Sequence, residues 1–179
     1  MIAVDGPAGA GKSTFAGRLA RFLDGAQVIH ADDFASWDNQ FEWWPRLLDQ
    51  VISPLRAGSP GRFQRYDWVQ RDFAEWHDVR PQPAIIIEGV GSARRQFTTS
   101  LAFAIWVEIA ADVRLRRGIE RDGEALRPFW EQWIDGERAH YARDCTRARA
   151  DLIVDGNPAR PPANPDAEYV RIRPFDAAG

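Results

Sequence analysis

The eight residues from Gly6 to Ser13 have the types and the spacing needed to hold a phosphate group. They read GPAGAGKS and fit the pattern G-x-x-x-x-G-K-[ST] throughout, between a strand-like segment and a helical one. Glycines let such a backbone curl so that N–H groups converge on phosphate oxygens, and the following helix adds its dipole. Lys12 would reach the outer phosphates and Ser13 would bind Mg²⁺. We therefore predict a site for ATP and Mg²⁺, with contacts from Gly6, Ala8, Gly9, Ala10, Gly11, Lys12, Ser13 and Thr14.

Lys12 is the one lysine of a chain that carries 22 arginines. A general preference for Arg over Lys explains the imbalance, yet the lysine that is kept lies where a compact ammonium group suits a phosphate. With no second lysine, the chain cannot contain the N-K-x-D motif that selects guanine. This argues against a Ras-like GTPase switch.

Acidic residues follow or end two other strand-like segments. Asp32 and Asp33 come after the segment 26–30, and Glu88 ends the isoleucine-rich segment 84–88, which is typical of a strand buried on both faces. In doubly wound sheets, the carboxyl ends of the strands open into the ligand crevice. There Asp32 could accept the proton of an attacking hydroxyl, and Glu88 could hold Mg²⁺ through water. The alternatives are an Asp pair that caps a turn and a glutamate that merely ends its strand.

A basic helix is predicted from Asp112 to Asp122. Three of its arginines are spaced at i, i+3 and i+7 and would share one face of the helix: Arg114, Arg117 and Arg121. Such a clamp stabilises the charge that develops on a transferred phosphoryl group, and Arg117 is predicted to be catalytic together with Lys12 and Asp32. Arg116 would point away. The alternative is a solvated basic face paired with neighbouring acidic residues.

The segments that carry these residues alternate between strand-like and helical patterns. Strands are expected at 1–5, 26–30, 84–88, 103–109 and 151–154, and helices at 12–23, 42–56, 112–122 and 128–147. A loop is predicted at 58–67, a short helix at 72–78 and an edge strand at 168–173. The alternation predicts an α/β protein with the P-loop NTPase fold, in which a five-stranded, mostly parallel sheet has helices on both faces. Residues 1–179 would form one domain with an arginine-rich lid at about 114–127.

Composition narrows the class of protein. The net charge of −3 over 179 residues argues against a general nucleic-acid binder, which would be basic. A lone cysteine, Cys145, and three histidines allow neither an intrachain disulfide nor a Cys/His zinc site. The longest uncharged apolar run, Leu101 to Val107, is far short of the roughly 20 residues that span a membrane. With no signal-like N-terminus, we expect a cytoplasmic protein without nucleic-acid or membrane partners; composition leaves its oligomeric state open.

Six motifs occur in the order seen in uridine kinase-like proteins, a group that includes phosphoribulokinase and pantothenate kinase relatives. They are GPAGAGKST, the triplet DDF, Tyr66-Asp67-Trp68, IIIEGV, VRLRRGIERD and ADLIVDG, and the resemblance covers roughly Met1 to Gly156. The resemblance implies transfer of the γ-phosphoryl group of ATP to a hydroxyl of a small molecule, often a primary hydroxyl of a ribose. Asp32 would be the general base and the three arginines of the basic helix would form the lid. The acceptor-binding residues implied are Asp32, Tyr66, Asp67 and, by looser analogy, Asp38.

One position departs from the family. A histidine that contacts the base typically follows the aromatic residue of the Tyr-Asp-aromatic motif by three residues, and Arg71 stands there in this chain. Together with Arg62 and Arg65, Arg71 predicts an anionic acceptor, such as a nucleoside monophosphate or a small acid. Arginines on a surface loop are an equally good interpretation. A nucleoside monophosphate kinase and a regulatory ATPase without an acceptor therefore stay open as alternatives.

Eight tryptophans are many for a chain of this length. Five lie in segments expected to cover the acceptor: Trp37, Trp43, Trp44, Trp68 and Trp76. Their rings could stack on a base or a sugar, although packing of a helix onto the sheet is the more frequent role. Trp130 and Trp133 are predicted to belong to the core.

Overall fold

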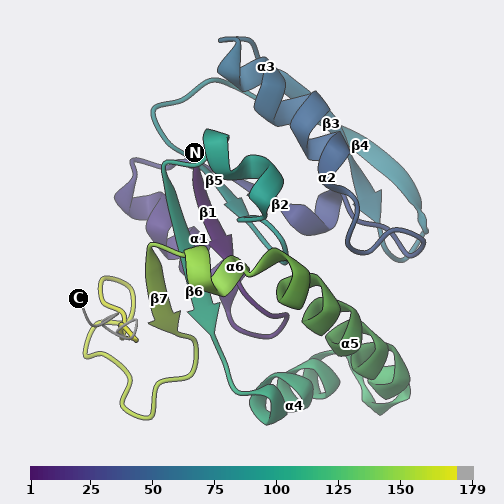
Figure 1. Ribbon diagram of the computed structural model, residues 1–179, viewed down its shortest axis with the longest axis vertical. Helices are drawn as coiled ribbons and strands as arrows, with labels where there is room; N and C mark the ends of the chain where they lie inside the picture. The colour runs from purple at the N-terminus through teal and green to yellow at the C-terminus, as the bar shows by residue number, and fades with distance from the viewer. Residues whose placement is uncertain (173–179) are drawn as a thin grey trace.

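The computed structural model describes residues 1–172 and contains a five-stranded parallel sheet (Figure 1). Its strands are β1 (Ile2–Asp5), β2 (Gln27–His30), β5 (Ile85–Glu88), β6 (Phe103–Glu108) and β7 (Leu152–Asp155), in the order β2-β5-β1-β6-β7. Every neighbouring pair in this sheet is parallel. The predicted α/β class and the P-loop type of sheet are confirmed.

Both faces of this sheet are buried. Successive side chains of a strand point to opposite sides, so each strand contributes to both faces. In β5, Ile85 and Ile87 belong to one hydrophobic cluster, whereas Ile86 belongs to the other. The face of Ile86 packs against α1 (Lys12–Phe22). The opposite face is covered by one continuous helical segment made of α2 (Trp44–Leu47), the π-helical η2 (Leu48–Ile52) and α3 (Ser53–Arg56). The predicted covering of both faces by helices is therefore confirmed.

Two long helices lie beyond the carboxyl ends of the strands, at the bottom of Figure 1. They are α4 (Ala111–Asp122) and α5 (Arg127–Asp144). Short elements complete the set: η1 (Ala31–Asp33), η3 (Arg95–Ser100), η4 (Glu124–Leu126) and α6 (Thr146–Arg149). The strand register pairs Glu88 with both Val4 and His30, so the strands end at the same level. Residues that follow different strands are thereby brought to one edge.

A hairpin replaces the loop at 58–67 and the helix at 72–78, and both of these predictions are wrong. It consists of β3 (Gly61–Asp67) and β4 (Asp72–Val79), paired antiparallel. Aromatic rings meet across the two strands, with Phe63 stacked on His77 at 5.4 Å and Tyr66 edge-on to Phe73 at 5.7 Å. Such cross-strand pairs stabilise a hairpin, but they become visible only once the register is known.

The segment after β7 forms less sheet than predicted. Within the described part of 168–173, the sheet contact is an isolated antiparallel bridge between Arg171 and Val154, and Arg173 lies outside the described residues. Four prolines precede it, at 158, 161, 162 and 165, and proline cannot donate a hydrogen bond to a ladder.

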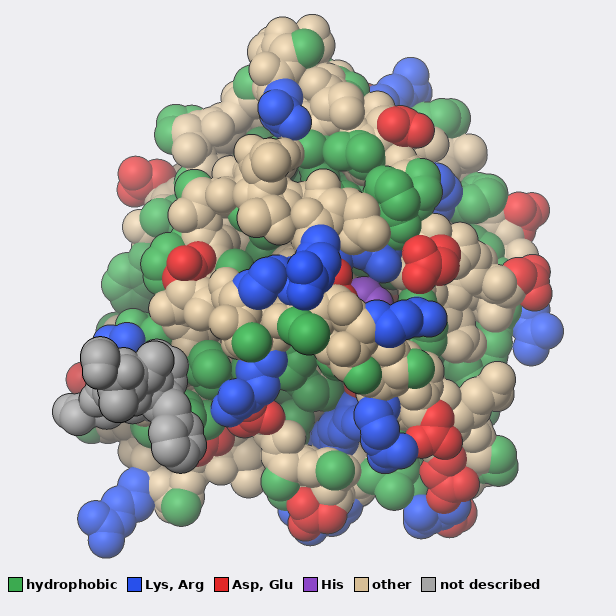
Figure 2. Space-filling model, viewed as in Figure 1, with side chains coloured by type: hydrophobic (Ala, Val, Ile, Leu, Met, Phe, Trp, Pro, Cys, Tyr) green, Lys and Arg blue, Asp and Glu red, His purple; other side chains and the backbone are tan. Residues whose placement is uncertain are grey.

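Charged side chains of both signs are scattered over the face drawn in Figure 2. Mixed charge is what the small net charge of −3 leads one to expect. Among the described residues, no helix has both the length and the apolar character needed to cross a bilayer.

Candidate active site

The phosphate loop connects β1 to α1 and has the backbone conformation that its glycines allow. Gly6, Gly9 and Gly11 have φ angles of 139°, 80° and 91°, which residues with a side chain rarely adopt. A Cβ atom on Gly6 would lie 2.4 Å from the carbonyl oxygen of Val107 in β6, so the loop rests directly on the neighbouring strand. The loop is therefore a narrow backbone cradle in which no larger residue could replace Gly6.

The helix behind the loop directs its free N–H groups into this cradle. The N-terminal cap is Gly11, and no side chain caps the helix. The N–H groups of the first turn have no acceptor within the helix, and with the helix dipole they favour an anion. The buried Lys12 folds back over the loop, where its Nζ donates to the carbonyl oxygen of Pro7 at 3.0 Å. A positive charge thus lies next to the amide groups that face the same space.

Asp5, the last residue of β1, anchors the start of the loop. Its buried carboxylate accepts hydrogen bonds from the N–H groups of Gly6, Gly91 and Ala93 and from the Tyr141 hydroxyl, at 2.7 to 2.9 Å. Burial raises the pKa of Asp5, although these donors favour its charged form. The sequence near Asp5 does not reveal this role, because the three partners outside the loop come from distant parts of the chain.

Ser13 and Glu88 meet at the predicted metal position. The Ser13 hydroxyl donates to Glu88 Oε1 at 3.1 Å, and His30 Nδ1 lies 2.6 Å from the same oxygen. Within residues 1–172, the buried Glu88 Oε2 has no hydrogen-bond partner. The hydrogen bond with Glu88 raises the pKa of His30. A hydroxyl beside a carboxylate oxygen that lacks a partner suits Mg²⁺, which prefers oxygen ligands and keeps several of its waters.

Few protein ligands are available to such an ion. The described residues contain no cluster of three or more His, Cys, Asp or Glu side chains that could hold a metal by themselves. This agrees with an Mg²⁺ site that takes its other ligands from phosphates and water. His30 was not among the predicted site residues. It joins the site because β2 and β5 are neighbours and His30 pairs in register with Glu88.

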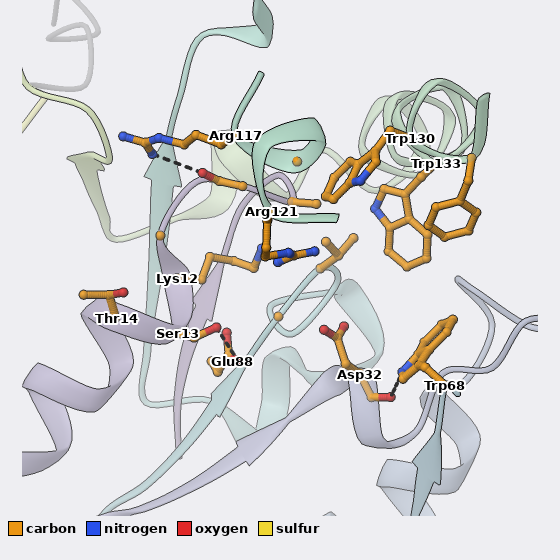
Figure 3. A pocket seen from close by; sticks show the side chains of 17 residues that line it. Lys12, Ser13, Thr14, Asp32, Trp68, Glu88, Arg117, Arg121, Trp130 and Trp133 are labelled. Carbon is orange, nitrogen blue, oxygen red and sulfur yellow. Dashed lines mark hydrogen bonds between the residues drawn. The ribbon is translucent and has the colours of Figure 1, made fainter. Parts of the chain in front are cut away.

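Asp32 lies in η1, directly after β2, and its side chain opens into the cavity above the loop (Figure 3). Asp32 is exposed to solvent through the open cavity, although the protein around its carboxylate still disfavours the charge. Burial raises the pKa of Asp32, Lys12 opposes the shift, and Glu88 adds to it. The main chain at Asp32 is held by Trp68, whose indole N–H donates to its carbonyl oxygen at 3.1 Å. A carboxylate with a raised pKa is a stronger base, as proton abstraction requires.

The cavity has a volume of about 530 Å³ and two chemically different sides. One side is formed by the phosphate loop, with Lys12 and Arg121 extending toward each other (Figure 3). The other side is aromatic and is lined by Trp68, Phe129, Trp130 and Trp133. Asp32 lies between the two sides.

Two of the three predicted lid arginines line this cavity. Arg117 donates to the carbonyl oxygens of Gly9 and Gly156, at 3.1 and 3.3 Å, and to Asn157 Oδ1 at 2.6 Å. Arg121 pairs with the adjacent Asp122 and lies over the Trp130 ring, 5.4 Å from its centre. Arg117 therefore joins the phosphate loop to the segment after β7.

Arg114, the third, does not line the cavity. It is buried on the outer side of the loop, where its guanidinium pairs with Glu137 of α5 and its Cβ packs on Gly9. The helical spacing correctly indicated that the three arginines share a side of α4. It contained no information on which end of that side faces the cavity and which end faces α5.

No protein-family model matches the chain, but curated uridine kinases do. The uridine kinase of Borrelia duttonii (strain Ly) is 24% identical over 177 residues, which cover 86% of this chain and 85% of that protein. The uridine kinase of Halobacterium salinarum is 28% identical over 178 residues, covering 86% and 78%. The solved structure of a possible uridine kinase from Bacillus stearothermophilus has a TM-score of 0.63 at 20% identity, covering 85% of this chain and 86% of that one.

The chain resembles uridine kinases over most of its length and has the fold of a P-loop kinase. The resemblance predicted from its motifs is confirmed, and these relatives support a kinase of the uridine kinase family. The similarity extends well beyond the phosphate loop, since it covers 86% of the chain in both curated relatives.

Apart from Asp32, the acceptor residues implied by the family resemblance lie outside the cavity. Tyr66 is buried in the hairpin between Trp68 and Phe73, with ring centres 5.5 and 5.7 Å away. Asp67 closes the hairpin turn, because its Oδ1 accepts from the N–H groups of Val69 and Gln70 at 2.9 Å. Asp38 is exposed and does not line the cavity. The hairpin instead presents Trp68 to the cavity, the one residue of the Tyr-Asp-Trp motif that lines it.

The three arginines predicted to bind an anionic acceptor are engaged elsewhere. Arg65 pairs with Glu75 and Asp67 at 2.7 and 3.1 Å, and Arg62 lies 3.4 Å from Asp78. Arg71 lies over the ring of Trp37, 4.8 Å from its centre. None of the three lines the cavity described above. Their clustering in sequence therefore corresponds to ion pairs and ring stacking on the hairpin.

Proposed function

We propose that this protein is an ATP- and Mg²⁺-dependent kinase that transfers the γ-phosphoryl group to a hydroxyl of a small molecule. One observation carries the proposal: Asp32, with its raised pKa, lines the same cavity as the phosphate loop and the Ser13–Glu88 pair. Phosphoryl transfer to a hydroxyl requires a site for the terminal phosphate of ATP and a base for the hydroxyl proton, both in one cavity. The uridine kinases among its relatives agree with this reaction class.

The nucleotide would extend across two adjoining cavities. A second cavity of about 650 Å³ shares Gly11, Thr14 and Arg117 with the first and lies between α1 and the segment after β7. Phosphates held by the loop would leave the base and the ribose in this second cavity, on the side away from Asp32. Arg117 borders both cavities and would contact the nucleotide where they meet.

Each charged group then has a role that follows from its position. Asp32 would accept the proton of the acceptor hydroxyl as that oxygen attacks the γ-phosphorus. Lys12 and Arg121 would stabilise negative charge on the phosphoryl group during transfer. Ser13 and Glu88 would hold Mg²⁺, which neutralises charge shared by the β- and γ-phosphates when bound. Most of the acceleration would come from positioning and electrostatics.

The acceptor is proposed to be an uncharged molecule with a flat or apolar body. The wall beyond Asp32 is aromatic, and the described cations that line the cavity are Lys12, Arg117 and Arg121, all from the phosphate loop or α4. A nucleoside monophosphate needs an arginine site for its own phosphate, and the engagement of Arg62, Arg65 and Arg71 elsewhere removes the reason for proposing one. An aromatic wall favours a nucleoside or a similar alcohol by stacking.

The substitution Asp32→Asn tests the proposal. It keeps the size of the side chain and removes the proton acceptor, so the transfer rate should fall by roughly 10² to 10⁴-fold. Calorimetric binding of MgATP should persist. The matched control is Asp33→Asn, because Asp33 is adjacent but does not line the cavity. Its rate should stay within a few-fold of the wild type.

The assay couples ADP release to a reporter reaction across a panel of nucleosides, nucleoside monophosphates and small acids. Turnover that needs a nucleoside and depends on Asp32 supports the proposal. ATP turnover that is indifferent to every acceptor and unaffected by Asp32→Asn would instead identify a regulatory ATPase. Faster turnover with a monophosphate would refute the uncharged acceptor.

A further inference from the structure

Glu137 is a fully buried carboxylate that joins three parts of the site. Its exposed fraction is 0%, and it lies in α5. Its Oε1 accepts the N–H of Ala8 at 2.8 Å and the indole N–H of Trp133 at 2.7 Å. Its Oε2 pairs with the guanidinium of Arg114. Glu137 itself does not line the cavity.

The three partners belong to different functional regions. Ala8 is part of the phosphate loop, 129 residues away in the chain. Trp133 belongs to the aromatic wall beyond Asp32, and Arg114 lies in α4, the helix that carries Arg117 and Arg121. One side chain thus contacts the nucleotide side, the acceptor side and the lid helix.

Close packing connects the same three regions mechanically. A Cβ atom on Gly9 would lie 3.1 Å from the Cβ of Arg114, and a Cβ atom on Gly118 would lie 2.5 Å from the ring of Trp130. The loop therefore packs on α4, and α4 packs on α5, with no room for a methyl group at Gly118. Dense interiors transmit displacements, so a shift of the loop reaches α5.

The sharing of Oε1 by two donors supplies the chemical link. Ala8 lines the cavity at the phosphate loop, and a phosphate oxygen would compete with Glu137 for its N–H. If the N–H of Ala8 turns toward a phosphate, Oε1 of Glu137 keeps only the Trp133 indole of these two donors. Hydrogen bonds polarise the groups that they share. Two donors on one oxygen compete for its electron density, so the bond from Trp133 strengthens when the N–H of Ala8 turns away.

We infer that Glu137 is a positioning residue that couples occupation of the phosphate loop to the placement of Trp133 on the acceptor side. This inference rests on the proposed function for the identity of the ligands, since it assumes that phosphates fill the loop. Glu137 touches neither substrate. It would order Trp133 and the aromatic wall when the nucleotide is present.

Two double variants test the inference while treating the buried ion pair identically. Arg114→Met/Glu137→Gln removes both charges but keeps a carbonyl oxygen that can accept from Ala8 and Trp133. Arg114→Met/Glu137→Met removes both charges and the acceptor. Because neither variant leaves an unpaired buried charge, a difference between them reports on the acceptor at position 137.

The first readout is the indole ¹H–¹⁵N resonance of Trp133, assigned by its loss in Trp133→Phe. Inorganic tripolyphosphate with Mg²⁺ is the probe, because it fills the loop without bringing an aromatic base. We expect the Trp133 indole proton to move downfield on saturation in the wild type and in the Gln double variant. In the Met double variant it should start upfield and stay unchanged. An unmoved Trp133 resonance in the saturated wild type overturns the inference, whether or not the Met double variant folds.

The second readout is kinetic. The Met double variant should have a kcat lower than that of the Gln double variant by roughly 10- to 100-fold, because a misplaced wall misplaces the acceptor hydroxyl. Its affinity for MgATP should differ from that of the Gln double variant by no more than a few-fold. Equal kcat values in two folded variants would refute the coupling. Failure of tripolyphosphate and MgATP to bind the wild type at all would refute the proposed function instead.

Discussion

Gly118→Ala should disturb the contact that holds α4 against α5. Gly118 is buried in α4 and faces the Trp130 ring, and an added Cβ would lie 2.5 Å from Cε2 and 2.7 Å from Cδ2. Carbon atoms in contact are ordinarily about 3.5 to 4.0 Å apart, so the two helices must separate by roughly 1 Å. The ring cannot simply turn away, because its Nε1 donates to Asp122 at 3.0 Å and Arg121 lies over its face.

Two opposing effects set the size of the change in stability. Alanine is more favourable than glycine inside a helix by about 1 kcal/mol. An extra methyl group in a well-packed site costs about 1 to 3 kcal/mol. The net loss in the free energy of unfolding for Gly118→Ala is thus about 0 to 2 kcal/mol. Gly17→Ala in α1 is the matched control, since its Cβ would meet no atom within 4 Å and should bring only the gain of about 1 kcal/mol.

Urea unfolding of both variants measures this difference, which should be about 1 to 3 kcal/mol in favour of Gly17→Ala. The melting temperatures should differ in the same direction, by about 2 to 4 °C per kcal/mol for a chain of this size. Since Arg117 precedes Gly118 in the helix, the transfer rate of Gly118→Ala should also fall, by about 10-fold or more. Equal stability and equal activity of the two variants would refute the packing argument.

Three further predictions concern the charged groups. Burial raises the pKa of Asp32 above its ordinary value of 3.8, so kcat should decline on the acid side at a higher pH than 3.8. The same shift means that ionisation of Asp32 destabilises the fold at neutral pH. Asp32→Asn should therefore raise the melting temperature, even though it slows transfer. Glu88→Gln should raise the Mg²⁺ concentration for half-maximal rate by roughly 10- to 100-fold at constant ATP, and an unchanged Mg²⁺ dependence would contradict its role. Arg117→Met should raise the KM for ATP by about 10-fold, whereas Arg116→Met, which removes an exposed side chain 4.0 Å from Glu120, should not.

The sequence was most informative where function depends on contiguous residues. The phosphate loop could be predicted because strand, glycine-rich turn and helix follow one another, and each local preference agrees with the others. The isoleucines of β5 likewise predicted a buried parallel strand, and Glu88 at its end lies beside Ser13 as expected. Strand ends could be assigned to one edge because parallel strands share a direction.

Prediction was least successful where a structure depends on contacts between two segments of the chain. The segment 61–79 has an irregular, charge-rich pattern, and its hairpin depends on ring pairs such as Phe63 with His77. The Tyr-Asp-Trp motif correctly marked a segment next to the site, but the residue that lines the cavity is Trp68, with Tyr66 in the hairpin core. Trp130 and Trp133 are buried, as predicted, and yet they also form the cavity wall.

By itself, the sequence determined the phosphate cradle, the parallel sheet and the set of groups available at its carboxyl edge. These features follow from backbone preferences and side-chain periodicity, which act between near neighbours in the chain. The tertiary structure alone decided which of those groups meet. Arg114 is spaced like a lid residue, but it is paired with Glu137 because α5 crosses beside α4 there. Helical spacing sets the angle between side chains, whereas the packing of one element on another decides what each side chain faces.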